Sequence, residues 1–251
     1  MTVFHSDLDN TLIYSGRHEI GEEKLPVELY EGREVSFVTR TSLSLLREIR
    51  ERAVFVPTTT RTEEQYGRID LRTGTPEYAL VCNGGVLLRG GEEIPDWYDQ
   101  SMELIRESRP ELVRAERWMQ EAPGRILEVR NIRGLFLFTK SSRPSEMAEQ
   151  LKERLDPALT EVFRNGNKVY VIPGGLDKGS AVRRLRTYIK ADTVLAAGDS
   201  GFDVPMLEEA DRAYAPEALF GTCRMGKHVR KIGQGVFSDE MLHMVLEELS
   251  T

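Results

Sequence analysis

The chain has 251 residues, of which 40% are hydrophobic and 30% are charged, and its formal net charge is −7 at pH 7. This length allows one large domain or two small ones, and the composition is typical of a globular protein with a sizeable core. The acidic balance argues against nucleic-acid binding, and no apolar run reaches the roughly 20 residues of a membrane span. We therefore expect a cytoplasmic protein without nucleic-acid or membrane partners and with free thiols at Cys82 and Cys223. Its oligomeric state is left open.

The first predicted element is a short apolar run from Val3 that indicates a buried strand and leads into Asp7 and Asp9. Side chains alternate along a strand, so the two carboxylates start on the same side. Like charges this close repel one another when they are buried. A divalent cation would relieve the repulsion, and hard oxygen ligands favour Mg²⁺. Alternatively, Asp7 caps a turn and Asp9 caps a helix.

Residues 13–40 are polar and contain glycine, with one short strand indicated at 35–38. A helix capped by Thr41 or Ser42 is predicted next, followed by a strand at residues 53–56. The order of strand, helix and strand indicates a parallel sheet. After this second strand come polar side chains at the edge where open α/β sheets bind ligands. These residues are Thr58, Thr59, Thr60 and Arg61. Either they meet a ligand, or the threonines cap the helix that follows.

The next predicted strand, residues 78–82, ends in Asn83-Gly84-Gly85. Such a sequence either brings the backbone close to a ligand or forms a hairpin turn. The composition then shifts at Ile94-Pro95. From there the chain has its own order of helix, two strands, helix and two strands, which predicts an inserted α+β module. The expected elements are a helix at 96–120 interrupted at Pro110, strands at 126–129 and 135–138, a helix at 145–155 and a hairpin at 161–172.

Lys178 opens a predicted helix, although the helix dipole disfavours a cation at that end. Such a local inconsistency marks either a functional site or a solvated surface lysine. The strand at 193–197 is followed by a second pair of carboxylates, Asp199 and Asp203, which either bind a ligand or belong to a turn that caps a helix. The remaining chain is predicted to form a last edge strand at 213–216, a basic solvated loop at 221–235 and a helix at 238–249.

Four of these segments, in this order, resemble the motifs of the haloacid dehalogenase superfamily of phosphohydrolases. Asp-Leu-Asp-Asn-Thr-Leu from Asp7 is similar to the first motif, Lys178-Gly179 to the third, and Gly-Asp with a second Asp four residues later to the fourth. Thr59-Thr60-Arg61 and Asn83-Gly84 resemble the Thr-Gly-Arg and Asn-Gly motifs of the Cof-type and sucrose-phosphatase-like branch. Because Thr60 replaces the glycine, Thr58 is the alternative to Thr59 as the second motif. Phe202 stands where this branch usually has asparagine.

This resemblance implies an α/β fold with a Rossmannoid parallel-sheet core, residues 1–94 and 174–251, and an inserted C2-type cap, residues 95–173, that carries substrate specificity. It also implies a Mg²⁺-dependent phosphatase that works through an aspartyl-phosphate. The catalytic residues would be Asp7 as nucleophile, Asp9 as acid and base, and Thr59 and Lys178 as groups that hold the phosphoryl oxygens. The implied metal ligands are Asp7, the backbone carbonyl of Asp9, Asp199 and Asp203.

The expected partner is a small phosphate ester, with a sugar phosphate or a glycosyl-phosphoglycerate as the leading substrate. Candidate substrate-binding residues in the core are Thr58, Thr60, Arg61, Asn83 and Gly84. Those in the cap are Arg164, Asn165, Asn167 and Lys168, which would equally fit an exposed turn. Two other functions stay open: a phosphotransferase or phosphomutase, and a non-catalytic regulator that binds a sugar phosphate. The aspartate pair at Asp7 and Asp9 argues against the regulator, because binding alone does not need proton chemistry.

Overall fold

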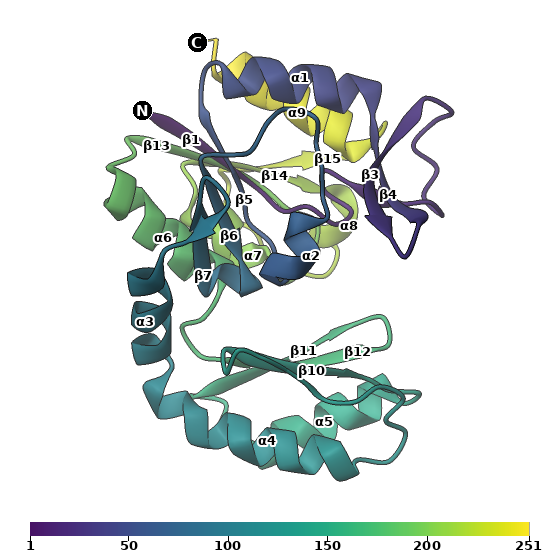
Figure 1. Ribbon diagram of the computed structural model, residues 1–251, viewed down its shortest axis with the longest axis vertical. Helices are drawn as coiled ribbons and strands as arrows, with labels where there is room; N and C mark the ends of the chain where they lie inside the picture. Colours follow the sequence, from purple (N-terminus) through teal and green to yellow (C-terminus); the bar gives the residue numbers. More distant parts are fainter. Residues whose placement is uncertain (251) are drawn as a thin grey trace. The chain divides into compact units, whose positions relative to one another are not determined.

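The computed structural model describes residues 1–250 (Figure 1). The chain divides into two compact units. The first combines Met1–Ile94 with the chain from Asp177 onward, and the second is Pro95–Leu176. Among the described residues, no helix is long and apolar enough to cross a membrane.

A five-stranded parallel sheet forms the centre of the first unit, in the order β15-β14-β13-β1-β5. Its strands are β1 (Thr2–Ser6), β5 (Val54–Pro57), β13 (Thr193–Ala197), β14 (Arg212–Pro216) and β15 (Val229–Ile232). This parallel α/β sheet confirms the predicted fold class.

The prediction of a last edge strand at 213–216 is wrong, because β14 lies inside the sheet and β15 forms the edge. β15 falls in the segment that was expected to be a basic loop. It is a strand because Val229 and Ile232 are buried, while Arg230 and Lys231 between them stay exposed. The Nζ of Lys231 pairs with Glu217 at 2.7 Å.

Helices cover both faces of this sheet (Figure 1). One apolar cluster joins the sheet to α1 (Arg40–Arg50) and α9 (Phe237–Glu248). A second cluster, on the other face, joins it to α6 (Lys178–Ile189), α7 (Val204–Glu209) and α8 (Glu217–Phe220). The first helix is capped by Thr39, whose side chain accepts the N–H of Ser42, and not by Thr41 or Ser42 as predicted. The helix therefore begins two or three residues earlier than predicted, directly after a strand.

Two small antiparallel sheets complete the first unit. One contains β2 (Tyr14–Ser15), β3 (Lys24–Tyr30) and β4 (Arg33–Thr39), and the other contains β6 (Tyr78–Val81), β7 (Val86–Arg89) and β8 (Glu92–Glu93). A short helix, α2 (Glu63–Gly67), and a 3-10 turn at Cys82–Gly84 follow β5 and β6. The sequence indicated only one short strand, 35–38, between Ile13 and Arg40, so the β3–β4 hairpin is larger than expected.

The second unit is a four-stranded antiparallel sheet in the order β11-β12-β10-β9 with its own core. Its elements are α3 (Pro95–Leu104), α4 (Arg109–Glu121), β9 (Arg130–Ile132), β10 (Phe136–Lys140), α5 (Pro144–Arg154), β11 (Thr160–Asn165) and β12 (Lys168–Pro173). The break between the first two helices precedes Pro110, which sits in the first turn of α4, where proline is tolerated. The strand predicted at 126–129 instead begins at Arg130. Before it, the N–H of Ile126 donates to the carbonyl of Lys140 and the Thr139 hydroxyl donates to the carbonyl of Leu127, without a regular ladder.

Candidate active site

The end of β1 places Asp7 at the carboxyl edge of the sheet. The N–H of Asp7 donates to the carbonyl of Ala197 at 2.9 Å, so the chain stays next to β13 for one residue beyond the strand. A one-turn loop follows, in which the carbonyl of Leu8 accepts the N–H groups of Leu12 and Ile13. This loop turns Thr11 back, so that its hydroxyl lies 3.4 Å from Oδ2 of Asp7.

Lys178 is the first residue of α6, whose N-cap Asp177 accepts the N–H of Ser180. Its side chain is only 1% exposed, and its Nζ donates to Oδ1 of Asp7 and Oδ1 of Asp203, each at 2.5 Å. Burial alone would lower the pKa of Lys178, but the charges of Asp203 and Asp7 raise it above its ordinary value. The ammonium therefore stays charged in spite of the unfavourable helix dipole.

The loop between β13 and α7 is organised by Asp203. Its Oδ2 accepts the N–H of Asp199 at 3.1 Å and the N–H and hydroxyl of Ser200 at 2.9 and 2.8 Å. A β-carbon on Gly198 would lie 2.3 Å from Cβ of Asp203, so this approach requires glycine. The loop brings Asp199 toward the first strand, where its Oδ1 lies 3.2 Å from the hydroxyl of Thr11.

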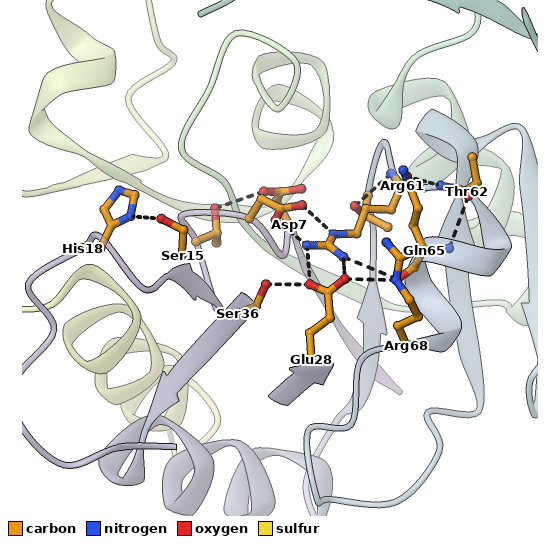
Figure 2. A network of polar contacts seen from close by, with 12 residues as sticks. Asp7, Ser15, His18, Glu28, Ser36, Arg61, Thr62, Gln65 and Arg68 are labelled. Atoms are coloured by element: carbon orange, nitrogen blue, oxygen red, sulfur yellow. Dashed lines mark hydrogen bonds and ion pairs between the residues drawn. The ribbon is translucent and has the colours of Figure 1, made fainter. Parts of the chain in front are cut away.

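Arg61 forms a second charged group with Asp9 and Glu28, and Figure 2 labels Arg61 and Glu28 of this group. Nε and Nη2 of Arg61 donate to the two carboxylate oxygens of Asp9, both at 2.8 Å. Nη1 and Nη2 donate to the two oxygens of Glu28, at 2.9 and 3.0 Å. Burial alone would lower the pKa of Arg61, but the two carboxylates raise it. Arg61 was predicted to bind substrate; here its guanidinium lies on two carboxylates, and a substrate role stays a prediction.

Thr58 and Thr59 are both buried, but their hydroxyls have different partners. The Thr58 hydroxyl lies 2.9 Å from Nδ1 of His5 and donates to the carbonyl of Val56. It is therefore used within the sheet. The Thr59 hydroxyl accepts the N–H of Arg61 at 3.2 Å, which leaves its own proton available to a ligand. This difference favours Thr59 as the phosphoryl-binding residue, an assignment that stays a prediction.

The turn after β6 joins the same edge of the sheet. The N–H of Asn83 donates to the carbonyl of Thr59 at 2.9 Å, and Asn83 itself has a left-handed backbone with φ 58°. A β-carbon on Gly84, whose φ is +86°, would lie 2.3 Å from Cβ of Ala181 in α6. Glycine is therefore required where the turn packs on the helix that carries Lys178. Thr60 is half-buried in the loop beside them.

A sequence model of haloacid dehalogenase-like hydrolases matches residues 95–217. The match covers 123 of the 251 residues, and together with the fold it supports a phosphohydrolase of this superfamily. Comparison with curated proteins found no match.

Similar solved structures include a sucrose-phosphatase from Synechocystis in complex with sucrose and phosphate, with 16% identity, 99% of this chain and 98% of that chain covered, and a TM-score of 0.65. They also include a trehalose-6-phosphate phosphatase from Aspergillus fumigatus, with 13% identity, 98% and 92% covered, and a TM-score of 0.58. A haloacid dehalogenase-like hydrolase from B. subtilis has 15% identity, 98% and 99% covered, and a TM-score of 0.60. At these identities the likeness shows a shared fold.

Haloacid dehalogenase-like hydrolases generally use Mg²⁺, and the donors of this chain fit such an ion. Asp7, Asp199 and Asp203 offer carboxylate oxygens that all lie within 4.8 Å of one another. Burial raises the pKa of Asp7 well above its ordinary value, and neighbouring carboxylates add to this against the charge of Lys178. Burial and the charge of Asp203 raise the pKa of Asp199 to about 7. One ammonium does not balance three carboxylates, so a hard cation suits this cluster.

The four candidate residues of the second unit lie on the β11–β12 hairpin. Arg164, Asn165 and Asn167 are exposed, and Lys168 is half-buried with its Nζ 5.8 Å from the centre of the Phe138 ring. Their expected role in substrate binding stays a prediction.

Thr11 and Glu28 contact predicted site residues but were not singled out from the sequence. Thr11 could have been found, because it stands within the first motif and four positions after Asp7. Glu28 could not be found from a motif. It lies on β3, in a segment that the sequence marked mostly as polar and irregular.

Proposed function

We propose that this haloacid dehalogenase-like hydrolase is a Mg²⁺-dependent phosphatase acting on a small phosphorylated metabolite, either a sugar phosphate or a glycosyl-phosphoglycerate. The observation that carries the proposal is the buried pair of Asp7 and Lys178, with Asp199 beside it. A carboxylate fixed by an ammonium at the edge of a sheet is positioned to act as a nucleophile toward phosphorus. The ammonium also suits the oxygens of an incoming phosphoryl group.

In the proposed first step, a carboxylate oxygen of Asp7 bonds to phosphorus while the bond from phosphorus to the leaving oxygen breaks. Asp9, in its protonated form, donates its proton to that leaving oxygen. In the second step, Asp9 takes a proton from water as the water oxygen bonds to phosphorus, and the bond between phosphorus and Asp7 breaks. Lys178 and the Thr59 hydroxyl bind the phosphoryl oxygens in both steps. Bound Mg²⁺ reduces the repulsion between the anionic nucleophile and the anionic phosphate.

Two considerations support a sugar phosphate as the substrate. Two of the proteins with a similar fold are named as a sucrose-phosphatase and a trehalose-6-phosphate phosphatase. The second unit also offers polar side chains on an exposed hairpin, which suit sugar hydroxyls. We propose that residues 95–173 form a cap that selects the substrate through Arg164, Asn165, Asn167 and Lys168.

Phosphate release from a panel of sugar phosphates, phosphoglycerates and nucleotides, with Mg²⁺ and with a chelator, tests the proposal. We expect Mg²⁺-dependent release that Asp7→Asn abolishes. Asp99→Asn is a matched control, because Asp99 is exposed on α3 of the second unit. No release from any panel member without an added acceptor would instead favour a phosphotransferase.

A further inference from the structure

Glu28 is a buried carboxylate with no role in the proposed reaction. It lies on β3, and its side chain is 3% exposed. The pairing of β3 with β4 is irregular on both sides of Glu28, and Val27 and Glu28 are both buried although they are consecutive in a strand. Such a bulge turns a side chain away from the direction that regular alternation would give it. The strand is therefore shaped so that Glu28 points into the molecule.

The surroundings of Glu28 keep it ionised. Burial alone would raise its pKa, but hydrogen bonds from Arg61 and Ser36 outweigh burial and lower the pKa. The Ser36 hydroxyl donates to Oε2 at 2.6 Å, and Nε of Arg68 donates to Oε1 at 3.2 Å. An apolar side chain would occupy this position at lower cost, since charges must be desolvated when they are buried. A retained buried carboxylate therefore calls for a reason beyond stability.

The position of Arg61 suggests such a reason. Its guanidinium lies on the carboxylate of Glu28 (Figure 2), and it also binds the carboxylate of Asp9. One edge of the guanidinium, Nε and Nη2, faces Asp9, and the other edge, Nη1 and Nη2, faces Glu28. Nη1 also lies 3.4 Å from the carbonyl of Gln65. The two carboxylates differ in one respect that matters: the Asp9 side chain is 48% exposed, whereas Glu28 is enclosed.

Because of this difference, the enclosed Glu28 is fixed in place, whereas the exposed Asp9 side chain is able to move. For proton transfer, Asp9 must reach the leaving oxygen within hydrogen-bond distance. A protonated carboxyl group cannot accept both bonds from Arg61, so Asp9 must release at least one of them. Arginine has a long flexible stem, and without a second anchor the guanidinium would move with Asp9. The bonds to Glu28 hold the guanidinium still while Asp9 moves, and an error of about 1 Å at such a group costs about 100-fold in rate.

We propose that Glu28 is a positioning residue, which acts through Arg61 to aim Asp9 at the leaving oxygen. The inference rests on the proposed function, since Asp9 needs to be aimed only if it transfers a proton. It assigns a role to the β3–β4 hairpin that the four motifs do not cover.

The test compares two substrates that differ in how much their leaving oxygen needs a proton. Nitrophenolate leaves readily without protonation, whereas phenolate is more basic and gains more from a proton donor. We expect Glu28→Gln to lower kcat/KM for phenyl phosphate about 10-fold more than for p-nitrophenyl phosphate. The ratio kcat/KM is used because it reports the step in which Asp7 is phosphorylated, whichever later step limits kcat. Asp9→Asn should give the same signature, and Glu28→Gln should add little to it in the double variant.

Two further variants keep the outcome decisive. Glu34→Gln makes the same chemical change at an exposed carboxylate of β4, and it should behave as wild type. If Glu28→Gln does not fold, Arg61→Lys serves instead, because an ammonium cannot bridge both carboxylates by paired bonds. Equal losses for both substrates, or no loss, would overturn the role of Glu28. Failure of the wild-type protein with Mg²⁺ on every phosphate ester would instead overturn the proposed function, and this inference with it.

Discussion

Replacing Lys178 by methionine is expected to destabilise the first unit strongly. The Nζ of Lys178 is buried between two carboxylate oxygens, each at 2.5 Å, so its removal leaves Asp7 and Asp203 without their cation. Breaking a buried ion pair on one side costs about 3–5 kcal/mol, because the remaining charge is desolvated and unpaired. Methionine keeps most of the apolar volume, so little of the loss comes from packing. We expect a decrease of about 3–5 kcal/mol in the unfolding free energy at about pH 8 without metal.

The loss in unfolding free energy is expected to depend on pH. Without Lys178, the folded-state pKa of Asp7 rises further above its unfolded value, so between these values the folded chain binds more protons than the unfolded chain. The free energy of unfolding therefore decreases as the pH rises, and the penalty shrinks toward acid pH. Mg²⁺ should restore part of the stability of the variant at about pH 8, because it replaces the missing positive charge.

Urea unfolding followed by far-UV circular dichroism measures the effect, with and without Mg²⁺, at about pH 8 and about pH 5.5. Both tryptophans, Trp97 and Trp118, lie in the second unit, so their fluorescence reports that unit separately. Lys227→Met is the control, because Lys227 is exposed. A loss no larger than that of the control, or one that does not change with pH, would refute the reasoning.

Two other predictions concern His5 and Gly198. Burial lowers the pKa of His5 to about 3, so the unfolded chain takes up this proton near pH 6.5 and the folded chain only far below it. Stability should fall by about 1.4 kcal/mol for each pH unit below 6.5, and His5→Gln should remove that part of the slope in urea unfolding. Gly198→Ala should displace Asp203 and lower both kcat, measured by phosphate release, and Mg²⁺ affinity, measured by calorimetric titration. Gly201→Ala is the control and should leave both near wild type, because a β-carbon there meets nothing within 4 Å.

Four of the five strands of the parallel core were predictable, because they are short buried runs, and the candidate residues stand where such runs end. Asp7 follows β1, Asp199 follows β13 and Lys178 opens α6, and in a parallel sheet such ends meet at one edge. The hairpin of β3 and β4 was not predictable in the same way. Pro26 and the mixed polar pattern hide β3, which owes its position to the bulge and to pairing with β4.

The sequence by itself indicated the superfamily, the parallel sheet and the chain positions that carry carboxylates, threonines and Lys178, because each is marked by a local pattern of a few residues. Only the tertiary structure decided how these side chains share their bonds. Arg61 reaches Asp9 across 52 positions and Glu28 across 33 positions, and the Thr58 hydroxyl turns to His5 across 53. Pairings of this kind depend on the approach of separate strands and on the desolvation of buried charges. Neither of these leaves a trace in the local order of the residues.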